Sequence, residues 1–168
     1  MKVLKIVLIG LGIIVGLLFT VALVIVDSAP ETYVYKENRI PKKYTEHILA
    51  LKLIDKDETI KYFYSDGFMK IDEGMYFITN KQVVLYSEEW PEPAEKIPFD
   101  QIINVEIEYN DTWLDDSWVY LNTEEFEYEF PLSNERGGDK KFIKYLKSQL
   151  AEDIPIVTLN TSSEDPEE

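Results

Sequence analysis

The sequence predicts a mainly β domain with helices, attached to one N-terminal transmembrane helix. Three observations lead to this prediction: an uncharged run from Ile6 to Val26, a series of short segments with strand character after residue 58, and one amphipathic helix pattern after those segments. We expect five regions along the chain: a positive flank (1–5), the transmembrane helix (6–26), a juxtamembrane linker and helix (27–54), the β domain (55–151), and an acidic, disordered tail (152–168).

The N-terminal run has the length and composition of a membrane span. Its 21 residues carry no charge, and a helix of that length rises roughly 31 Å, about one hydrocarbon thickness. A secretory signal peptide has an apolar core of only about 7 to 15 residues and ends at small residues. Here Asp27 places an acid where a small residue is needed. We therefore expect an uncleaved anchor in the cell membrane.

The charges beside the span give a mixed indication of its orientation. Lys2 and Lys5 favour a cytoplasmic amino end, which would put the bulk domain outside the cytoplasm. Basic residues after the span favour the opposite orientation, namely Lys36, Arg39, Lys42 and Lys43. We predict a single-pass protein with an extracytoplasmic domain.

Gly12 and Gly16 form a GxxxG pattern inside the predicted span. This spacing places both glycines on one helix face, where two backbones can approach closely. The pattern predicts packing between transmembrane helices and a homodimer formed through them. The alternative is that these glycines only reflect how common glycine is in membrane helices.

The charge of the remaining chain excludes one class of partner and disfavours another. After Val26 there are 15 basic and 32 acidic residues, a net charge of −17. Nucleic-acid binding requires a basic face, and anionic lipid head groups attract basic clusters. The composition therefore argues against nucleic acid and against docking of this domain on anionic lipids. Without cysteine, the domain has neither disulfides nor thiolate metal ligands.

An amphipathic helix is expected before the β segments. Pro41 suits a first helical position, and apolar residues then recur at intervals of three and four up to Ile54. We predict a helix over Pro41–Ile54 that packs on the domain that follows.

Seven segments then change to the two-residue period of strands. They are Glu58–Tyr64, Gly74–Thr79, Gln82–Ser87, Lys96–Phe99, Ile102–Tyr109, Ser117–Asn122 and Glu125–Phe130. In the fifth, Ile103, Val105 and Ile107 are expected to face the core, and in the seventh Phe126 and Phe130. Such a series in antiparallel order indicates a small barrel or sandwich.

A C-terminal helix is expected to cap the barrel. Asp139 is a candidate N-cap, and Phe142, Ile143, Leu146 and Leu150 form an apolar stripe opposite lysines. Ile154–Leu159 is a candidate further strand, and the acidic residues after it lack the apolar content of a packed segment.

Three stretches resemble bacterial pleckstrin-homology-like, or GRAM-like, domains. They are Glu58-Thr59-Ile60, the hairpin Tyr76–Leu85 around Thr79-Asn80-Lys81, and Ile97-Pro98-Phe99-Asp100-Gln101-Ile102, followed by the terminal helix. The resemblance covers about residues 55 to 150. It implies a strongly bent seven-stranded barrel capped by one helix. It also implies a role in scaffolding or in binding lipids or proteins, with no catalysis and no cofactor.

Candidate catalytic and metal-binding residues are few. His47 is the only histidine, and the chain has no P-loop, GxGxxG or histidine pair for zinc. Asp111, Asp115 and Asp116 offer the oxygen ligands that calcium uses, but without the spacing of an EF-hand. A solvated turn between strands is the alternative interpretation, so these three acids are a candidate metal site only.

Trp113 and Trp118 flank the acids of this turn and are candidates for a partner surface. Aromatic rings beside carboxylates suit a cationic or peptide partner, and the alternative is that both rings complete the edge of the core. The sequence as a whole predicts a membrane-anchored, non-catalytic interaction or scaffolding module with an unknown protein partner. The alternative function is an envelope-facing hydrolase that uses carboxylates or a metal.

Overall fold

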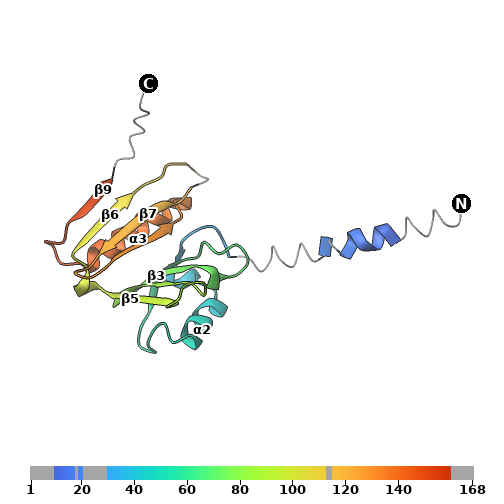
Figure 1. The fold of residues 1–168 in the computed structure, drawn as a ribbon, viewed down its shortest axis with the longest axis horizontal. Coiled ribbons are helices and arrows are strands. Elements are labelled where there is room, and N and C mark those ends of the chain that lie inside the picture. Colours follow the sequence, from blue (N-terminus) through green and yellow to red (C-terminus); the bar gives the residue numbers. More distant parts are fainter. Residues whose placement is uncertain (1–9, 18, 21–29, 113–114, 160–168) are drawn as a thin grey trace, which may run out of the picture.

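Two β-sheets form the domain in a computed structural model, which describes residues 10–17, 19–20, 30–112 and 115–159 (Figure 1). The five-stranded sheet has the order β1-β2-β3-β4-β5, and the four-stranded sheet has the order β8-β7-β6-β9. All neighbouring strands are antiparallel except β9, which runs parallel to β6. The prediction of a mainly β domain with helices is confirmed.

The strands and helices have the following bounds. The strands are β1 (Tyr35–Lys36), β2 (Ile60–Tyr64), β3 (Met75–Thr79), β4 (Gln82–Tyr86), β5 (Ala94–Pro98), β6 (Asn104–Glu108), β7 (Ser117–Asn122), β8 (Glu127–Leu132) and β9 (Ile156–Leu159). The α-helices are α2 (Lys42–Ala50) and α3 (Gly138–Gln149), and the short 3-10 helices are η1 (Glu37–Arg39), η2 (Ile71–Glu73), η3 (Phe99–Gln101) and η4 (Glu135–Gly137).

The prediction of a single seven-stranded barrel is wrong. The seven expected strands are β2 to β8, but they divide between two sheets after β5. Pro98 ends β5, where it lacks the amide needed to continue the strand ladder, and η3 then turns the chain towards β6. β1 joins one sheet and β9 the other, so the candidate strand near the C-terminus is confirmed.

The central strands of the five-stranded sheet, β2 to β4, are covered on both faces, which explains why all five residues of β3 are buried. On one face, Phe63, Phe77 and Val84 belong to a cluster with Tyr44 and Ile48 of α2. On the other face, alternate residues of β2 to β4 pack with the second sheet and α3. Phe142 and Leu146 of α3 are fully buried in that second cluster. α3 therefore covers the core as a C-terminal helix, as predicted.

Both α-helices differ in detail from the predictions: α2 begins at Lys42, one residue after the predicted start, and α3 has a different N-cap. α2 ends at Ala50, four residues before the predicted end, because Lys52 adopts a left-handed conformation with φ 57°. Asp139 is not the N-cap of α3, because Gly137 takes that position with φ 64°. The Asp139 carboxylate is instead buried, and Ser117 Oγ donates a 2.8 Å hydrogen bond to it.

About half of the predicted transmembrane segment lies outside the described residues. The part that is described, 10–17 and 19–20, is helical and exposed. Among the described residues, no helix combines the length and the hydropathy needed to cross a membrane. The predicted flank at 1–5 and the end of the predicted tail, from residue 160, also lie outside the described residues.

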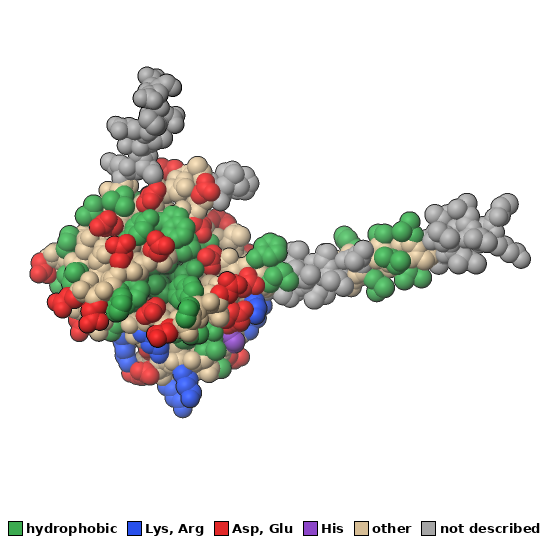
Figure 2. All heavy atoms as spheres, in the orientation of Figure 1, with side chains coloured by type: hydrophobic (Ala, Val, Ile, Leu, Met, Phe, Trp, Pro, Cys, Tyr) green, Lys and Arg blue, Asp and Glu red, His purple; other side chains and the backbone are tan. Residues whose placement is uncertain are grey.

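The surface has the acidic character that the composition indicates. Figure 2 shows acidic side chains scattered over the visible face between apolar ones, with basic side chains gathered near its lower edge. The basic residues are therefore not spread evenly over this face.

Candidate functional site

The three acids of the candidate metal site make three separate contacts. Asp111 Oδ1 lies 4.0 Å from Lys140 Nζ, and the Asp111 side chain is 95% exposed. Asp115 accepts a 2.9 Å hydrogen bond from Thr112 Oγ1, also in an exposed position. Asp116 accepts one from Tyr64. Nowhere in the described ranges do three His, Cys, Asp or Glu side chains gather in a way that could hold a metal ion.

Trp118, by contrast, borders a cavity. It lies on β7, remains 41% exposed, and lines a cavity of about 710 Å³ together with Asp66, Asp115 and Asp116. The other lining residues are mainly polar: Thr32, Tyr64, Pro131, Ser133, Asn134 and Glu135. We call this the Trp118 cavity. Trp113, the other predicted partner residue, lies outside the described residues.

Two tyrosine–aspartate hydrogen bonds order one wall of the Trp118 cavity. Tyr64 and Tyr76 are neighbours across the β2–β3 ladder, and each hydroxyl donates to a different carboxylate. Tyr64 Oη lies 2.6 Å from Asp116 Oδ2, and Tyr76 Oη lies 3.1 Å from Asp66 Oδ2. Residues 52 positions apart in the sequence are therefore held together at this wall.

Burial makes these two carboxylates costly to ionise. Desolvation raises the pKa of Asp116 and also that of Asp66, and the charge of Asp66 raises the pKa of Asp116 further. Desolvation likewise raises the pKa of Tyr64 and of Tyr76, so both hydroxyls stay protonated donors. A cation bound beside Asp66 and Asp116 would offset the repulsion between these carboxylates. The cavity is thus suited to a positively charged group.

Asn134 fixes the loop that carries the acids. Its Nδ2 donates to the carbonyl oxygens of Asn110, Thr112 and Asp115, at 2.8, 2.5 and 3.2 Å. The sequence did not indicate Asn134, Tyr64, Asp66 or Tyr76 as residues of a site. No local pattern marks them, because their roles depend on contacts between strands distant in sequence.

His47 lies on α2, apart from the Trp118 cavity. Its Nε2 is 2.6 Å from Asp72 Oδ1, and the His47 side chain is 40% exposed. Asp72 is the one side-chain hydrogen-bond partner of this ring among the described residues. The contact fastens α2 to η2 and supplies no nucleophile.

Gly12 and Gly16 both fall in described helical positions. A Cβ added at either would meet no described atom within 4 Å, so this face of the helix is open in the single chain. Homodimer formation through these glycines stays a prediction.

Comparison with known proteins identifies no family for this chain. No family model matches the sequence, and no curated protein matches it. Several solved structures show some likeness to this chain. A DUF1696 family protein with a pleckstrin-homology domain from Shewanella loihica PV-4 is 14% identical, with a TM-score of 0.48 over 71% of this chain and 98% of that one.

Two other structures have lower TM-scores. The pleckstrin homology domain from Shewanella amazonensis SB2B is 18% identical, with a TM-score of 0.45 over 66% of this chain and 88% of that one. The hSac2 domain of the human phosphoinositide phosphatase Sac2 is 13% identical, with a TM-score of 0.41 over 75% and 92% of the two chains. At such identities and TM-scores, these likenesses carry no argument about what this protein does.

Proposed function

We propose that this protein is a membrane-anchored, non-catalytic interaction module whose β domain binds a protein or peptide partner at the bacterial cell membrane. One observation carries the proposal: the half-exposed Trp118 ring stands beside the carboxylates of Asp66 and Asp116 in a cavity of about 710 Å³. The order of seven strands followed by a helix, β2 to β8 and α3, agrees with the pleckstrin-homology-like resemblance of the sequence.

A cationic side chain of the partner fits this cavity by its chemistry. An arginine or lysine over the indole face would gain a cation–π contact, and the carboxylate of Asp116 would complement its charge. Tryptophan residues that can become fully covered often dominate the energetics of an interface. A positively charged peptide segment is therefore the partner that the geometry supports best.

The anchor supports a location at the membrane. The uncharged segment Ile6–Val26 would hold the chain in the bilayer, with Lys2 and Lys5 on the cytoplasmic side and the domain outside. In this arrangement the Trp118 cavity would recruit its partner from the extracytoplasmic side.

Peptide titration tests the partner class. The full chain in uncharged detergent micelles would be titrated with a lysine- and arginine-rich decapeptide and with a glutamate-rich one, by calorimetry. We expect saturable binding of the basic peptide only, weakened about tenfold or more by Trp118→Ala. Phe126→Ala is the matched control, because Phe126 is also an exposed aromatic residue but lines a different cavity. Equal weakening by both variants, or preference for the acidic peptide, would contradict the proposal.

Topology is tested separately. A reporter that is active only in the cytoplasm would be fused after Glu168. We expect it to be inactive, and activity would place the domain and its partner in the cytoplasm.

A further inference from the structure

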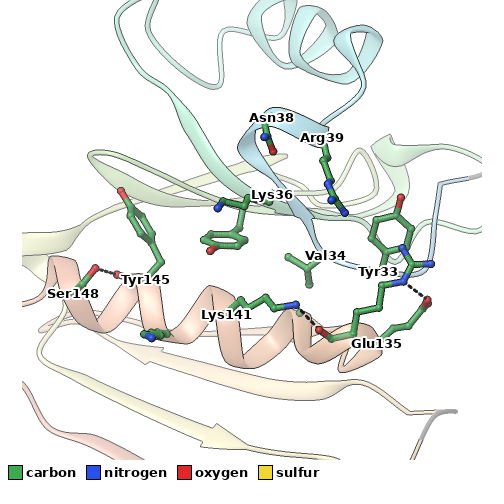
Figure 3. A pocket seen from close by; sticks show the side chains of 13 residues that line it. Tyr33, Val34, Lys36, Asn38, Arg39, Glu135, Lys141, Tyr145 and Ser148 are labelled. Atoms are coloured by element: carbon green, nitrogen blue, oxygen red, sulfur yellow. Dashed lines mark hydrogen bonds and ion pairs between the residues drawn. The ribbon is translucent and has the colours of Figure 1, made fainter.

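A second cavity brings together basic side chains that are far apart in the sequence. It has a volume of about 720 Å³ and lies between the segment before α2 and one face of α3, from Gly138 to Ser148 (Figure 3). Five cationic side chains line it: Lys36, Arg39, Arg136, Lys141 and Lys144. Of the described residues that line it, Glu135 is the single acid. We call this the basic cavity. In a chain with 32 acidic and 17 basic residues, this grouping is the opposite of what the net charge suggests.

The positive charge of the basic cavity is largely uncompensated. Both oxygens of Glu135 are already engaged, Oε1 with Arg136 Nε at 3.2 Å and Oε2 with Thr32 Oγ1 at 2.7 Å. Across the described part of the chain, no carboxylate lies within 4.0 Å of the side-chain nitrogens of four of the five cations, namely Lys36, Arg39, Lys141 and Lys144. These four exposed side chains leave the cavity with a net positive charge that a bound anion would neutralise.

Close packing holds the two sides of the basic cavity together. A Cβ added to Gly138 would lie 2.7 Å from Val34 Cγ2 and 3.0 Å from the carbonyl oxygen of Ser133. The backbone at the start of α3 thus approaches Val34 as closely as a glycine permits. Val34 lies between the two basic sides in Figure 3, with Lys36 and Arg39 on one side and Lys141 on the other.

The turn before α3 places Arg136 in an unusual backbone conformation. Arg136 has φ 59° and the following Gly137 has φ 64°, so a non-glycine residue occupies the left-handed region, a conformation found at sites that the surrounding structure strongly determines. Its guanidinium lies over the Tyr33 ring, with Cζ 4.1 Å from the ring centroid. This contact aligns one cation at the edge of the cavity.

The rest of the basic cavity combines donors with aromatic walls. Lys141, Tyr145 and Ser148 recur at intervals of four and three on one face of α3. Opposite them, Lys36 of β1 is the register partner of Tyr62 of β2. The rings of Tyr62 and Tyr145 lie 5.9 Å apart. The cavity can therefore hold a charged group among its cations and an organic group against its rings.

We propose that the basic cavity binds the phosphoryl group of an organic phosphate. Arginine presents a planar fork of donors that matches phosphate oxygens, and lysines add point charges. The two sources of such a group are the head group of an anionic phospholipid and a soluble phosphate ester. The position of the cavity favours the lipid, an argument that rests on the proposed membrane anchor. Tyr33 follows Val26 by seven residues, which reach at most about 25 Å.

The test uses the full chain in uncharged detergent micelles and calorimetric titration with glycerol 3-phosphate, dihexanoyl phosphatidylglycerol and dihexanoyl phosphatidylcholine. We expect saturable binding of at least one of the two anionic probes and none of the zwitterionic one. Tighter binding of the phosphatidylglycerol supports a lipid source, and equal or tighter binding of the glycerol phosphate supports a soluble source. No saturable binding of either anion would overturn the proposal.

Two triple variants of equal charge change separate the cavity from the overall charge. The cavity variant, Lys36→Gln/Arg39→Gln/Lys141→Gln, should weaken binding about tenfold or more. The control variant, Lys42→Gln/Lys43→Gln/Lys147→Gln, removes three exposed cations that do not line the cavity. It should change binding less than about twofold. Equal weakening by both would overturn the proposal. The single Lys141→Arg variant, which keeps the charge, should retain binding. An unchanged Tm of the cavity triple variant excludes a loss of binding caused by misfolding. Extraction of membranes with alkaline carbonate tests the anchor by itself, so failure of the anchor is distinguishable from failure of this site.

Discussion

The guanidinium carbon of Arg136 lies 4.1 Å from the centroid of the Tyr33 ring. This contact joins the segment before β1 to the turn before α3, two parts of the chain that are about a hundred residues apart. Tyr33 in turn lies against Tyr35, with ring centroids 4.8 Å apart, and Tyr35 belongs to the cluster beneath α2. The contact between Arg136 and Tyr33 therefore connects the N-terminal part of the domain to the turn before its C-terminal helix.

Two substitutions of Arg136 should show separately how much the cation–π contact and the left-handed backbone conformation contribute to the free energy of unfolding. Arg136→Ala removes the cation–π contact but keeps a side chain at φ 59°, so we expect a loss of about 0.5–1 kcal/mol in the free energy of unfolding. Arg136→Gly loses the same contact, but glycine adopts this conformation without strain, which should return about 1 kcal/mol. Urea titration of the full chain in micelles measures both. Equal stability of the two variants would show that the left-handed conformation costs nothing here.

Gly138→Ala should destabilise the domain by about 1–3 kcal/mol, because the added methyl group would overlap Val34. Val34→Ala in the same chain removes Cγ2, the atom nearest to that methyl group, but keeps Val34 Cβ, which would lie 2.8 Å from it. The double variant should therefore recover only part of the loss. The comparison of Tm values for the two single variants and the double variant provides the measurement. Additive losses would mean that the two sites do not touch.

Thr79→Val should cost about 2–4 kcal/mol, because several hydrogen bonds depend on one buried hydroxyl. Thr79 Oγ1 donates to Glu58 Oε1 at 2.6 Å and accepts from the amides of Lys81 and Gln82 at 3.0 and 3.1 Å. Thr59→Val is the matched control, since the hydrogen bonds of Thr59 are made by its backbone. Chemical denaturation should show less than about 0.5 kcal/mol for that control. A similar loss in both variants would contradict the role of the hydroxyl.

The Tyr64–Asp116 pair should give stability a measurable pH dependence. Because burial raises the pKa of Asp116 in the folded state, the folded protein binds this proton more tightly than the unfolded chain. The ionised group therefore disfavours folding at neutral pH, and this penalty is lost as the pH falls through the raised pKa. Asp116→Asn, which can still accept from Tyr64, should match or exceed wild-type stability at pH 7, with a difference that shrinks towards about pH 4.

Tyr64→Phe tests the same pair from the other side. It removes the donor and leaves Asp116 without its 2.6 Å hydrogen bond, so we expect a loss of about 1–3 kcal/mol at pH 7 and a smaller one near pH 4. Thermal melts across this pH range measure the effect, with the exposed Asp115→Asn as control. A loss that does not vary with pH would mean that Asp116 does not change its protonation state over this range.

The sequence identified most elements of the fold because each has a local signal. The alternation of Val105 and Ile107 predicted β6 correctly, and both side chains are about 1% exposed or less. The same reasoning failed at strand ends. Ile103 is 45% exposed because it precedes β6, and Phe126 is 60% exposed because it belongs to the turn before β8. A two-residue period cannot show where a strand begins.

The division into two sheets and both cavities depend on contacts that no local pattern records. The sequence indicated that Trp118 stands near Asp115 and Asp116, which line the same cavity, but it did not indicate Asp66, which reaches that cavity from the loop after β2. The net charge of −17 after Val26 also concealed the basic cavity, because an average over the chain says nothing about where Lys36 and Lys141 meet.

Burial of the central strands of the five-stranded sheet on both faces affects how the molecule can open. The cluster under α2 and the cluster under α3 share strands β2 to β4 but contact opposite faces of them. Loss of the α2 contacts alone would expose Tyr44 and Ile48 and leave the contacts between the two sheets and α3 in place. Such partial opening would release the amide protons of α2 to solvent exchange long before those of β3 and β4, so the domain would lose its order in stages, beginning at α2.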